Sequence, residues 1–468
     1  MLRIRIKKTV RQNRFLTKGV KVKSLTRSRN QYLRRRSFSL CAVGLLAAGC
    51  FFAVRPLSLT ASAAPQEKSA LPMAKPEAVG FSAGLPQKIH DAVQSHLDKG
   101  DVPGVIVLVS RNDRVAYWDA QGVIDAKTKV PINKDTIFWV ASMTKPIVTT
   151  AVMMMMEAGK LSVDDPVSKF IPEFKTPAQV RVLKPGSPAP SATPGPPDPN
   201  APKPQYDLVP AERPITIKDL LTHTSGIQSI GVPKDSLPPV QQGATLASWV
   251  PKLGATQLDF QPGSKWAYSN AAGFDVLARI VEVTSGQPFN QFVQQRIFDP
   301  LDIHDSGFGP RQELAARNMP LDPNLLKAPC ISGTTFFCGS AGMFMPADDY
   351  WRSSEMLLHQ GQAPHTKRLL KASSVEMMSS NQVGNLFAGF GGIPATGMGF
   401  GFSMEVVTDQ AASKLALPNG SFGWNGVGTR QFWIVPSEKV VIVMYVPSGS
   451  ASPVHRDIES AVMSSIRH

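Results

Sequence analysis

The chain has 468 residues, of which 43% are hydrophobic and 18% charged, a globular composition that excludes a disordered protein. Its length exceeds one ordinary hydrophobic core, so we expect more than one subdomain. The net charge of +15 comes from the start, where 15 Lys and Arg residues precede residue 64 and no Asp or Glu occurs before Glu67. The remainder is electrically balanced and lacks the basic surface of a nucleic-acid-binding domain, so no nucleic-acid partner is expected.

Residues 1–64 have the pattern of a basic signal or targeting segment. A long basic region is followed by an uncharged run of 18 residues at 37–54 and by small residues at 61–64 that suit a signal peptidase. We expect a cleaved signal peptide and an exported protein, periplasmic or secreted. An uncleaved membrane anchor and a retained nucleic-acid-binding arm are the alternatives. Arg35-Arg36 resembles a twin-arginine signal, and Cys50 stands in an imperfect lipoprotein box where a lipid anchor would attach.

The next segments alternate between helix and strand signals. Residues 65–80, rich in Pro and Ala, predict a linker, and apolar residues four apart predict a helix over 85–99. Two strand patterns flank Asn112-Asp113 and predict a hairpin, whose first strand is apolar on both faces and therefore buried. A helix is expected from about Ser142 to Gly159, because the proline at 146 is tolerated only in a first turn.

The middle of the chain is mainly helical, and its end returns to strands. Helical patterns occupy 216–223 and 271–285, while a proline-rich insert at 184–204 predicts a surface loop or lid. The later elements are strands at 400–407, 429–436 and 439–447, a glycine-rich rim loop at 389–401, and a last helix at 454–467. We predict an α+β domain over 81–467, in which both chain ends form one antiparallel sheet flanked by helices and a helical subdomain is inserted at roughly 160–340.

Cysteine and histidine spacing gives no sign of a metal or cofactor. Cys330 and Cys338 form either one small disulfide loop or two buried thiols, and the sequence favours neither. No histidine stands near them at zinc-ligand spacing, and the eight histidines include no His-Glu-x-x-His pattern. No glycine pattern for nucleotide binding occurs in a strand–helix context, so we expect neither a cofactor nor a metal ion.

Two serines compete as nucleophile. Ser82 lies in "GFSAG", which matches the nucleophile elbow of α/β-hydrolases, but no hydrophobic strand pattern precedes it, so we interpret it as a helix cap or a loop residue. Ser142 and Lys145 are three residues apart at a predicted helix start and therefore share one face. A lysine whose pKa is lowered by burial can activate such a serine, and the helix N-terminus adds backbone N–H groups near the site of attack.

Two further motifs follow in order, Tyr268-Ser269-Asn270 and Trp424-Asn425-Gly426, together with "LLTHTSGI" and "IFDPLDIHDSGF". Over roughly residues 75–467 the chain resembles the serine β-lactamase and penicillin-binding superfamily, in the branch close to class C β-lactamases and β-lactamase-like (family VIII) carboxylesterases. The resemblance implies that these motifs meet in one cleft. It also implies that His223, within "THTSG", is structural.

The resemblance assigns a role to each motif residue. Ser142 attacks a carbonyl, Lys145 helps to remove its proton, and Tyr268 acts as base and then acid, either as phenolate or through a shared proton. Asn270 holds the acyl side of the substrate or the Lys145 ammonium. The oxyanion lies between the backbone N–H groups of Ser142 and Val427.

The third motif departs from the β-lactamases, which usually carry Lys-Thr-Gly there. Trp424 takes the place of the lysine and, with Asn425 and Gly426, is expected to bind substrate through an apolar contact rather than a carboxylate pair. Arg430 either replaces the missing charge or is an edge-strand arginine in solvent.

The expected function is a serine hydrolase that acts on carboxylic esters through an acyl-enzyme. A β-lactamase, a D-amino-acid peptidase, a transacylase and a penicillin-binding protein without turnover remain as alternatives. The expected partner is a small ester, amide or β-lactam substrate.

Overall fold

The computed structural model describes residues 68–175, 178–188, 202, 204–229, 237–363, 367–427, 429–448 and 451–468. The predicted targeting segment, including Cys50, and most of the proline-rich insert lie outside these residues. In the part of the chain that is described, no helix has the length and apolar character needed to cross a membrane.

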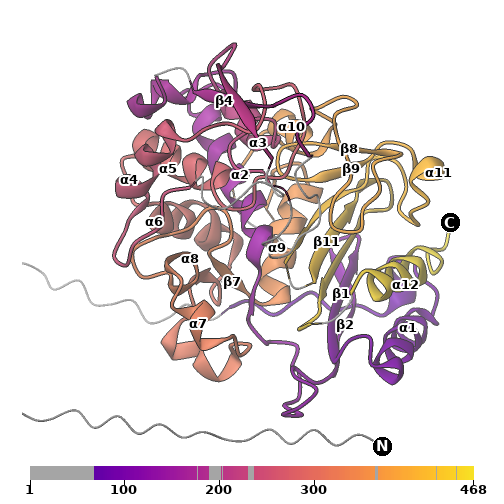
Figure 1. Cartoon of the computed structure of the whole chain (residues 1–468). Coiled ribbons are helices and arrows are strands. Elements are labelled where there is room, and N and C mark those ends of the chain that lie inside the picture. Colours follow the sequence, from indigo (N-terminus) through magenta and orange to yellow (C-terminus); the bar gives the residue numbers. More distant parts are fainter. Residues whose placement is uncertain are drawn as a thin grey trace, which may run out of the picture. The chain divides into compact units, whose positions relative to one another are not determined.

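Both ends of the chain build one seven-stranded antiparallel sheet, as predicted (Figure 1). The spatial order is β2-β1-β12-β11-β10-β9-β8. The strands are β1 (Gly104–Arg111), β2 (Arg114–Gly122), β8 (Met398–Phe400), β9 (Glu405–Val407), β10 (Phe422–Gly426), β11 (Arg430–Val435) and β12 (Val440–Tyr445). The two chain ends meet where β1 pairs with β12, with Ile106 opposite Tyr445.

Local sequence explains the hairpin at the start of this sheet. Residues 105–109 are buried, which fits a strand that has β2 on one side and β12 on the other. Asn112 and Asp113 have φ angles of 51° and 67°, the left-handed values that a tight two-residue hairpin turn needs and that Asn and Asp tolerate. The predicted strand at 400–407 is instead two short strands, β8 and β9, because the chain reverses at 401–404, where Ser403 has a φ of 65°.

Helices cover both faces of the sheet (Figure 1). α1 (Leu85–Lys99) and α12 (Ala451–Met463) pack together on one face, and α9 (Ala347–Leu358) packs against β1, β11 and β12 on the other. The predicted helix 85–99 is confirmed with these bounds, and its four-residue spacing buries Leu85, Ile89 and Val93 against the sheet.

Between residues 160 and 340 most of the regular elements are helices, and α5 and α6 pack against α2 (Thr144–Glu157). Its helices are α3 (Ile217–Leu221), α4 (Leu246–Trp249), α5 (Gly273–Ser285), α6 (Phe289–Val293), α7 (Pro323–Leu326) and α8 (Pro329–Ser332). Two strands that we did not predict, β4 (Gln179–Leu183) and β5 (Tyr206–Pro210), pair on either side of the proline-rich insert. The remaining elements are β3 (Phe138–Trp139), β6 (Gly307–Phe308), β7 (Met343–Met345), α10 (Ala372–Ser379) and α11 (Gln410–Ser413).

The stretch from Lys68 to Gly80 belongs to the folded domain, so the linker prediction was wrong over these residues. The Lys68 ammonium pairs with the carboxylates of Asp348 and Asp349 at the start of α9. Met73 forms a β-bridge with Val115. Composition alone gave no sign of these partners, because they lie far along the chain.

Ser82 is a loop residue, as one of the two expected alternatives had it, and is neither a nucleophile elbow nor a helix cap. Between Lys68 and Ser82 the structure describes no strand of the large sheet, and the backbone N–H of Ser82 donates to the carbonyl of Ser465. The N-cap of α1 is Gly84, where no side chain caps the helix, and the carbonyl of Ser82 accepts from the N–H of Leu85. A backbone turn therefore begins α1, in place of a cap by the Ser82 side chain.

Candidate active site

Ser142 lies where the chain passes from β3 into α2. A short 3-10 turn (Ala141–Met143) carries it, and α2 begins at Thr144, so the predicted helix start is correct within two residues. The side chain of Ser142 is 8% exposed, whereas Lys145, one turn further on, is completely buried. The three-residue spacing thus puts both side chains on one face, with the lysine beneath the serine.

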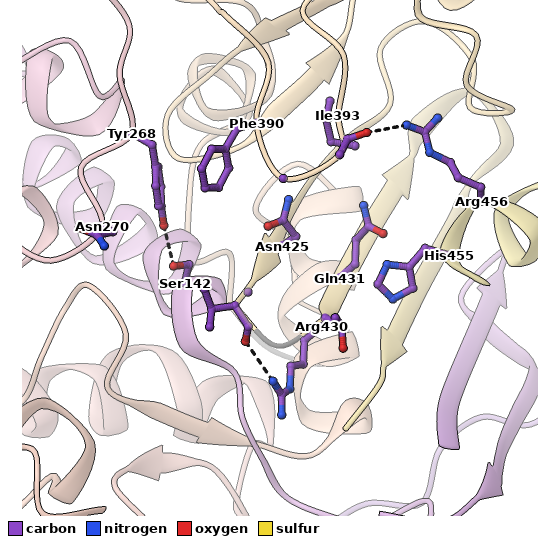
Figure 2. Close-up of a pocket in the computed structure, with 15 residues that line it drawn as sticks. Ser142, Tyr268, Asn270, Phe390, Ile393, Asn425, Arg430, Gln431, His455 and Arg456 are labelled. Atoms are coloured by element: carbon purple, nitrogen blue, oxygen red, sulfur yellow. Dashed lines mark hydrogen bonds between the residues drawn. The ribbon is translucent and has the colours of Figure 1, made fainter. Parts of the chain in front are cut away.

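The Ser142 hydroxyl lies between two potential proton carriers, of which Figure 2 shows Tyr268. The Tyr268 hydroxyl donates to Ser142 Oγ over 2.6 Å, and Lys145 Nζ donates to the same oxygen over 3.2 Å. Lys145 Nζ also donates to the backbone carbonyl of Ser340 over 2.7 Å. The structure therefore brings together the three residues predicted to be catalytic, although they come from motifs more than 120 residues apart.

The surroundings of Lys145 favour its neutral form. Burial lowers the pKa of Lys145 to about 7, and the negative charge of Asp275 offsets only part of this effect. The ammonium nitrogen lies 5.0 Å from the centre of the Tyr268 ring and 5.6 Å from that of Phe274. Near neutral pH a large fraction of Lys145 is therefore able to accept a proton.

Asp275 is a site residue that sequence reasoning missed. It lies in α5, is buried, and accepts a hydrogen bond from the backbone N–H of Ser340 over 2.9 Å. Burial raises the pKa of Asp275 to about 7, against the opposing effects of this hydrogen bond and of Lys145. Its sequence signal was an acidic residue in the otherwise apolar first turn and a half of this helix. Ser340 links the two groups, since its N–H binds Asp275 and its carbonyl binds Lys145.

A disulfide between Cys330 and Cys338 closes the loop that leads to Ser340. The alternative of two free thiols was therefore wrong. Cys338 is buried, and Gly339 packs so closely on the backbone of Phe274 that a Cβ there would collide with it. The covalent loop and this close contact together hold the carbonyl that Lys145 uses.

Burial raises the pKa of Tyr268 above its usual range, although the Ser142 hydroxyl and Trp424 counteract part of the effect. Tyr268 is therefore a neutral phenol at physiological pH. His223 packs against it with ring centres 4.6 Å apart, and His223 Nδ1 accepts the N–H of Ser269 over 3.2 Å. This histidine holds the tyrosine loop and makes no hydrogen bond to Ser142, which agrees with the predicted structural role.

A cavity of about 270 Å³ opens beside Ser142 (Figure 2). It is lined by Ser142, Tyr268, Asn270, Phe390, Gly391, Gly392, Ile393, Asn425, Gly426, Val427, Thr429, Arg430, Gln431, His455 and Arg456. Asn270 is exposed at the cavity, whereas the hydrogen bonds of Lys145 go to Ser142 and Ser340. This geometry favours the first of the two expected roles of Asn270, contact with the acyl side of the substrate.

Trp424 does not line the cavity, which corrects its assignment as a substrate-binding residue. It is completely buried and stacks behind Phe390, with ring centres 5.9 Å apart and planes at 15°. Phe390, from the glycine-rich rim loop, is the aromatic residue that reaches the cavity, and its ring lies 4.4 Å from that of Tyr268. The tryptophan supports an aromatic wall and does not form its surface.

Gly426 and Val427 bring the end of β10 next to Ser142. A Cβ at Gly426 would collide with the carbonyl oxygen of Val140, so glycine is required where β10 passes the turn that precedes the serine. Val427 is 68% exposed and lines the same cavity as Ser142. The backbone N–H groups of Ser142 and Val427 are therefore candidates for an oxyanion hole.

Arg430 is not a solvent-exposed edge residue. It is 2% exposed, and β11 lies inside the sheet between β10 and β12, not at an edge. Its guanidinium donates to the carbonyl of Val427 over 3.0 Å and lies 5.0 Å from the centre of the Phe138 ring. Burial lowers the pKa of Arg430 to about 10, so it stays charged at neutral pH. The arginine braces the turn that carries Val427.

The cavity has an aromatic end and a polar end (Figure 2). Phe390 and Tyr268 form the first, while Asn425, Gln431 and His455 contribute to the second. Burial lowers the pKa of His455 to about 4, so this histidine is neutral. Among the described residues, no carboxylate lines the cavity. The polar end can therefore accept hydrogen-bonding groups without repelling a developing negative charge.

Comparisons with known proteins show the family to which the chain belongs. The Beta-lactamase family matches residues 89–459. The chain is 29% identical over 381 residues to esterase EstB of Burkholderia gladioli, covering 74% of this chain and 86% of that protein. It is 32% identical over 310 residues to lovastatin esterase of Penicillium rubens, covering 62% and 72%.

A solved structure extends the likeness to three dimensions. EstCE1, described as a hydrolase with promiscuous acyltransferase activity, matches with a TM-score of 0.66 at 25% identity, covering 81% of this chain and 98% of that one. The family match spans most of the sequence, and the named relatives include esterases. The chain therefore belongs to the β-lactamase family and is a serine hydrolase of its esterase-like kind.

Proposed function

We propose that this protein hydrolyses neutral carboxylic esters through an acyl-enzyme formed on Ser142. The observation that carries the proposal is the position of Ser142 Oγ, 2.6 Å from the Tyr268 hydroxyl and 3.2 Å from a buried Lys145 whose pKa is lowered to about 7. A serine needs a nearby base to become nucleophilic, and a neutral lysine supplies one.

The first step transfers the Ser142 proton to neutral Lys145 while Oγ bonds to the ester carbonyl carbon. The carbonyl π electrons move to its oxygen, and the N–H groups of Ser142 and Val427 stabilise the resulting oxyanion. Removal of one such donor typically lowers the rate by ~10²–10³. Arg430 supports this geometry, because its bond to the Val427 carbonyl fixes the plane of a peptide that neighbours the oxyanion site.

The second step releases the alcohol. The carbonyl re-forms, the ester C–O bond breaks, and the leaving oxygen takes the proton of the Tyr268 hydroxyl, which is replaced by the proton held on Lys145. Because burial raises the pKa of Tyr268, we assign the shared-proton role to this tyrosine and not the phenolate role. Water then attacks the acyl-enzyme with the same groups acting in reverse, which returns Ser142 and releases the acid.

The substrate class follows from the cavity walls. Phe390 presents an aromatic surface next to Tyr268, which suits an apolar acyl or alcohol group. The guanidinium of Arg430 is already bound to Val427 and stacked on Phe138, which argues against its use as a carboxylate receptor for β-lactams. The names of two relatives, esterase EstB and lovastatin esterase, support an ester as well.

We also infer that the protein works outside the cytoplasm after removal of residues 1–64. The basic start, the uncharged run and the small residues at 61–64 support export. The Cys330–Cys338 disulfide agrees with this, because disulfides persist mainly in oxidising compartments. The N-terminal residue of the protein recovered from its host tests the inference, and a retained Met1 would contradict it.

Hydrolysis of p-nitrophenyl butyrate tests the proposed reaction. We expect Ser142→Ala to lower kcat/KM by at least about 10³-fold. Ser82→Ala is the matched control and should leave turnover unchanged, because the Ser82 side chain caps nothing. Comparable activity of Ser142→Ala and wild type would refute the proposal.

Two further outcomes would assign a different activity to the same site. Faster turnover of a chromogenic cephalosporin than of simple esters would identify a β-lactamase. Stoichiometric labelling of Ser142 by a penicillin that persists without turnover would identify a penicillin-binding protein.

A further inference from the structure

Three ionisable side chains meet outside the active site, where the turn between β1 and β2 approaches the end of α9. They are Asp113, Glu355 and His359, and we call them the His359 cluster. His359 Nε2 lies 2.6 Å from Asp113 Oδ1 and 3.6 Å from Glu355 Oε2. One oxygen or nitrogen atom from each residue lies within 4.8 Å of the others, so a small side-chain rotation would let a single ion contact all three.

The backbone of α9 and of the hairpin turn positions the three side chains. Glu355 is in the last turn of α9, and His359, four residues later, is its C-cap, so both side chains project from the same face. Asp113 is held at the hairpin turn by its left-handed φ of 67°. Two of the side chains therefore come from one rigid helix end and the third from a rigid turn.

Glu355 has a buried oxygen that lacks a hydrogen-bond partner. The residue is 1% exposed, and its Oε2 makes no hydrogen bond to any residue that the structure describes. The other oxygen, Oε1, accepts from Ser110 Oγ over 2.5 Å, and Ser110 Oγ in turn accepts from Trp351 Nε1 over 2.8 Å. This relay fixes the carboxylate and leaves Oε2 buried, without a hydrogen bond, 3.6 Å from His359 Nε2.

A second histidine shows how the His359 cluster differs from an ordinary ion bridge. His96 Nδ1 lies 2.7 Å from Asp101 and its Nε2 lies 2.9 Å from Asp457, so each carboxylate has its own ring nitrogen. In the His359 cluster both carboxylates converge on the same nitrogen, Nε2. A single N–H group cannot point well at two acceptors, whereas a cation placed between the three atoms binds all of them.

We propose that the His359 cluster binds one divalent transition-metal ion of the Zn²⁺ type through His359 Nε2, Glu355 Oε2 and Asp113 Oδ1. One imidazole and two carboxylates form a ligand set that suits Zn²⁺ and Co²⁺, whereas Ca²⁺ and Mg²⁺ prefer oxygen ligands alone. The ion ties the β1–β2 turn to α9, which packs against β1. Its role is structural, and the expectation of no metal ion, drawn from histidine spacing alone, is revised.

Binding of Co²⁺ and Zn²⁺ to the tag-free protein tests the proposal after EDTA treatment and dialysis. We expect visible Co²⁺ absorption bands that saturate at one ion per chain and are displaced by Zn²⁺. Titration calorimetry should show that Asp113→Asn lowers the Zn²⁺ affinity at least about tenfold. Zn²⁺ should also raise the melting temperature of the wild type and not that of the variant.

Asp113→Asn is chosen because asparagine also tolerates a positive φ, so the hairpin turn is preserved. Its ester turnover at 25 °C should equal that of the wild type, which reports that the domain is folded. His359→Gln should remove the Co²⁺ bands. His90→Gln is the matched control, since His90 is an exposed residue of α1, and it should bind as the wild type does.

Two outcomes would overturn the proposal. Absence of stoichiometric Co²⁺ and Zn²⁺ binding by the wild type would show that His359 is simply a protonated bridge between two carboxylates. Equal Zn²⁺ affinity of the wild type, Asp113→Asn and His359→Gln would show that the ion binds elsewhere.

Discussion

Lys68 and Lys145 are both largely buried, yet their pKa values move in opposite directions. Burial opposes the charge of each, but Asp349 and Asp348 outweigh it at Lys68 and raise the pKa of that lysine. At Lys145 the single offsetting carboxylate, Asp275, is too weak, and burial lowers the pKa to about 7. Charged partners, more than depth, therefore decide whether a buried lysine acts as a structural cation or as a base.

The largest expected effect comes from removing the base. Lys145→Gln should lower kcat/KM for p-nitrophenyl butyrate by about 10³-fold, since a glutamine side chain cannot accept the Ser142 proton. Lys68→Gln, assayed under the same conditions, should retain the kcat/KM of the wild type. If both variants lost kcat/KM equally, the two lysines would not differ in role, because the loss of turnover would then reflect loss of folding.

The opposite pattern is expected for stability. Lys68→Gln leaves Asp348 and Asp349 unpaired in a site where the lysine side chain is 18% exposed, and it should lower the free energy of unfolding by about 2–3 kcal/mol. Urea denaturation measures the change, with Lys99→Gln on the exposed surface of α1 as the control. A loss below about 0.5 kcal/mol would mean that the segment around Lys68 contributes little to the fold.

The pH dependence of kcat/KM of the wild type tests the assignment of Lys145 as the base. Because Lys145 must be neutral to accept a proton, kcat/KM should rise with pH and level off above about pH 7. Below that value it should fall about tenfold per pH unit. A rising limb near pH 10 would instead show that the lysine retains an ordinary pKa.

The smallest effect concerns the carboxylate beside Lys145. Asp275 raises the pKa of Lys145, so Asp275→Asn should move the rising limb of the kcat/KM profile to lower pH. Asparagine retains an oxygen that can accept the Ser340 N–H, which keeps the loop in place. An unchanged profile would indicate that Asp275 is protonated, and hence uncharged, when Lys145 titrates.

The sequence motifs predicted which residues meet at Ser142, because their spacing encodes local geometry. Ser142 and Lys145 share a helix face by virtue of their separation alone, and Tyr268 was found through its own motif. Trp424 and Asn425 were both assigned to the substrate, but neighbouring residues of a strand point to opposite faces. Asn425 faces the cavity and Trp424 faces the core. The alternation of side chains along a strand therefore allowed only one of these two residues to contact substrate.

Other site features depend on contacts that a sequence does not display. Arg430 lies on a strand with neighbours on both sides and not on an edge strand, and strand order is a property of the whole sheet. Phe390 reaches the cavity from a loop that glycine content alone marked as a rim. The His359 cluster joins residues 246 positions apart, far beyond the reach of a metal-binding spacing motif.

The pairing of β1 with β12 also has a consequence for biosynthesis. Ile106 needs Tyr445 as its neighbour, so a ribosome must make almost the entire chain before the sheet can close. Until then the hydrogen-bonding edge of β1 is unpaired and open to aggregation or to capture by a chaperone. A release factor acting a few dozen codons early would therefore yield a chain that keeps Ser142, Lys145 and Tyr268 and yet has no completed sheet on which to hold them.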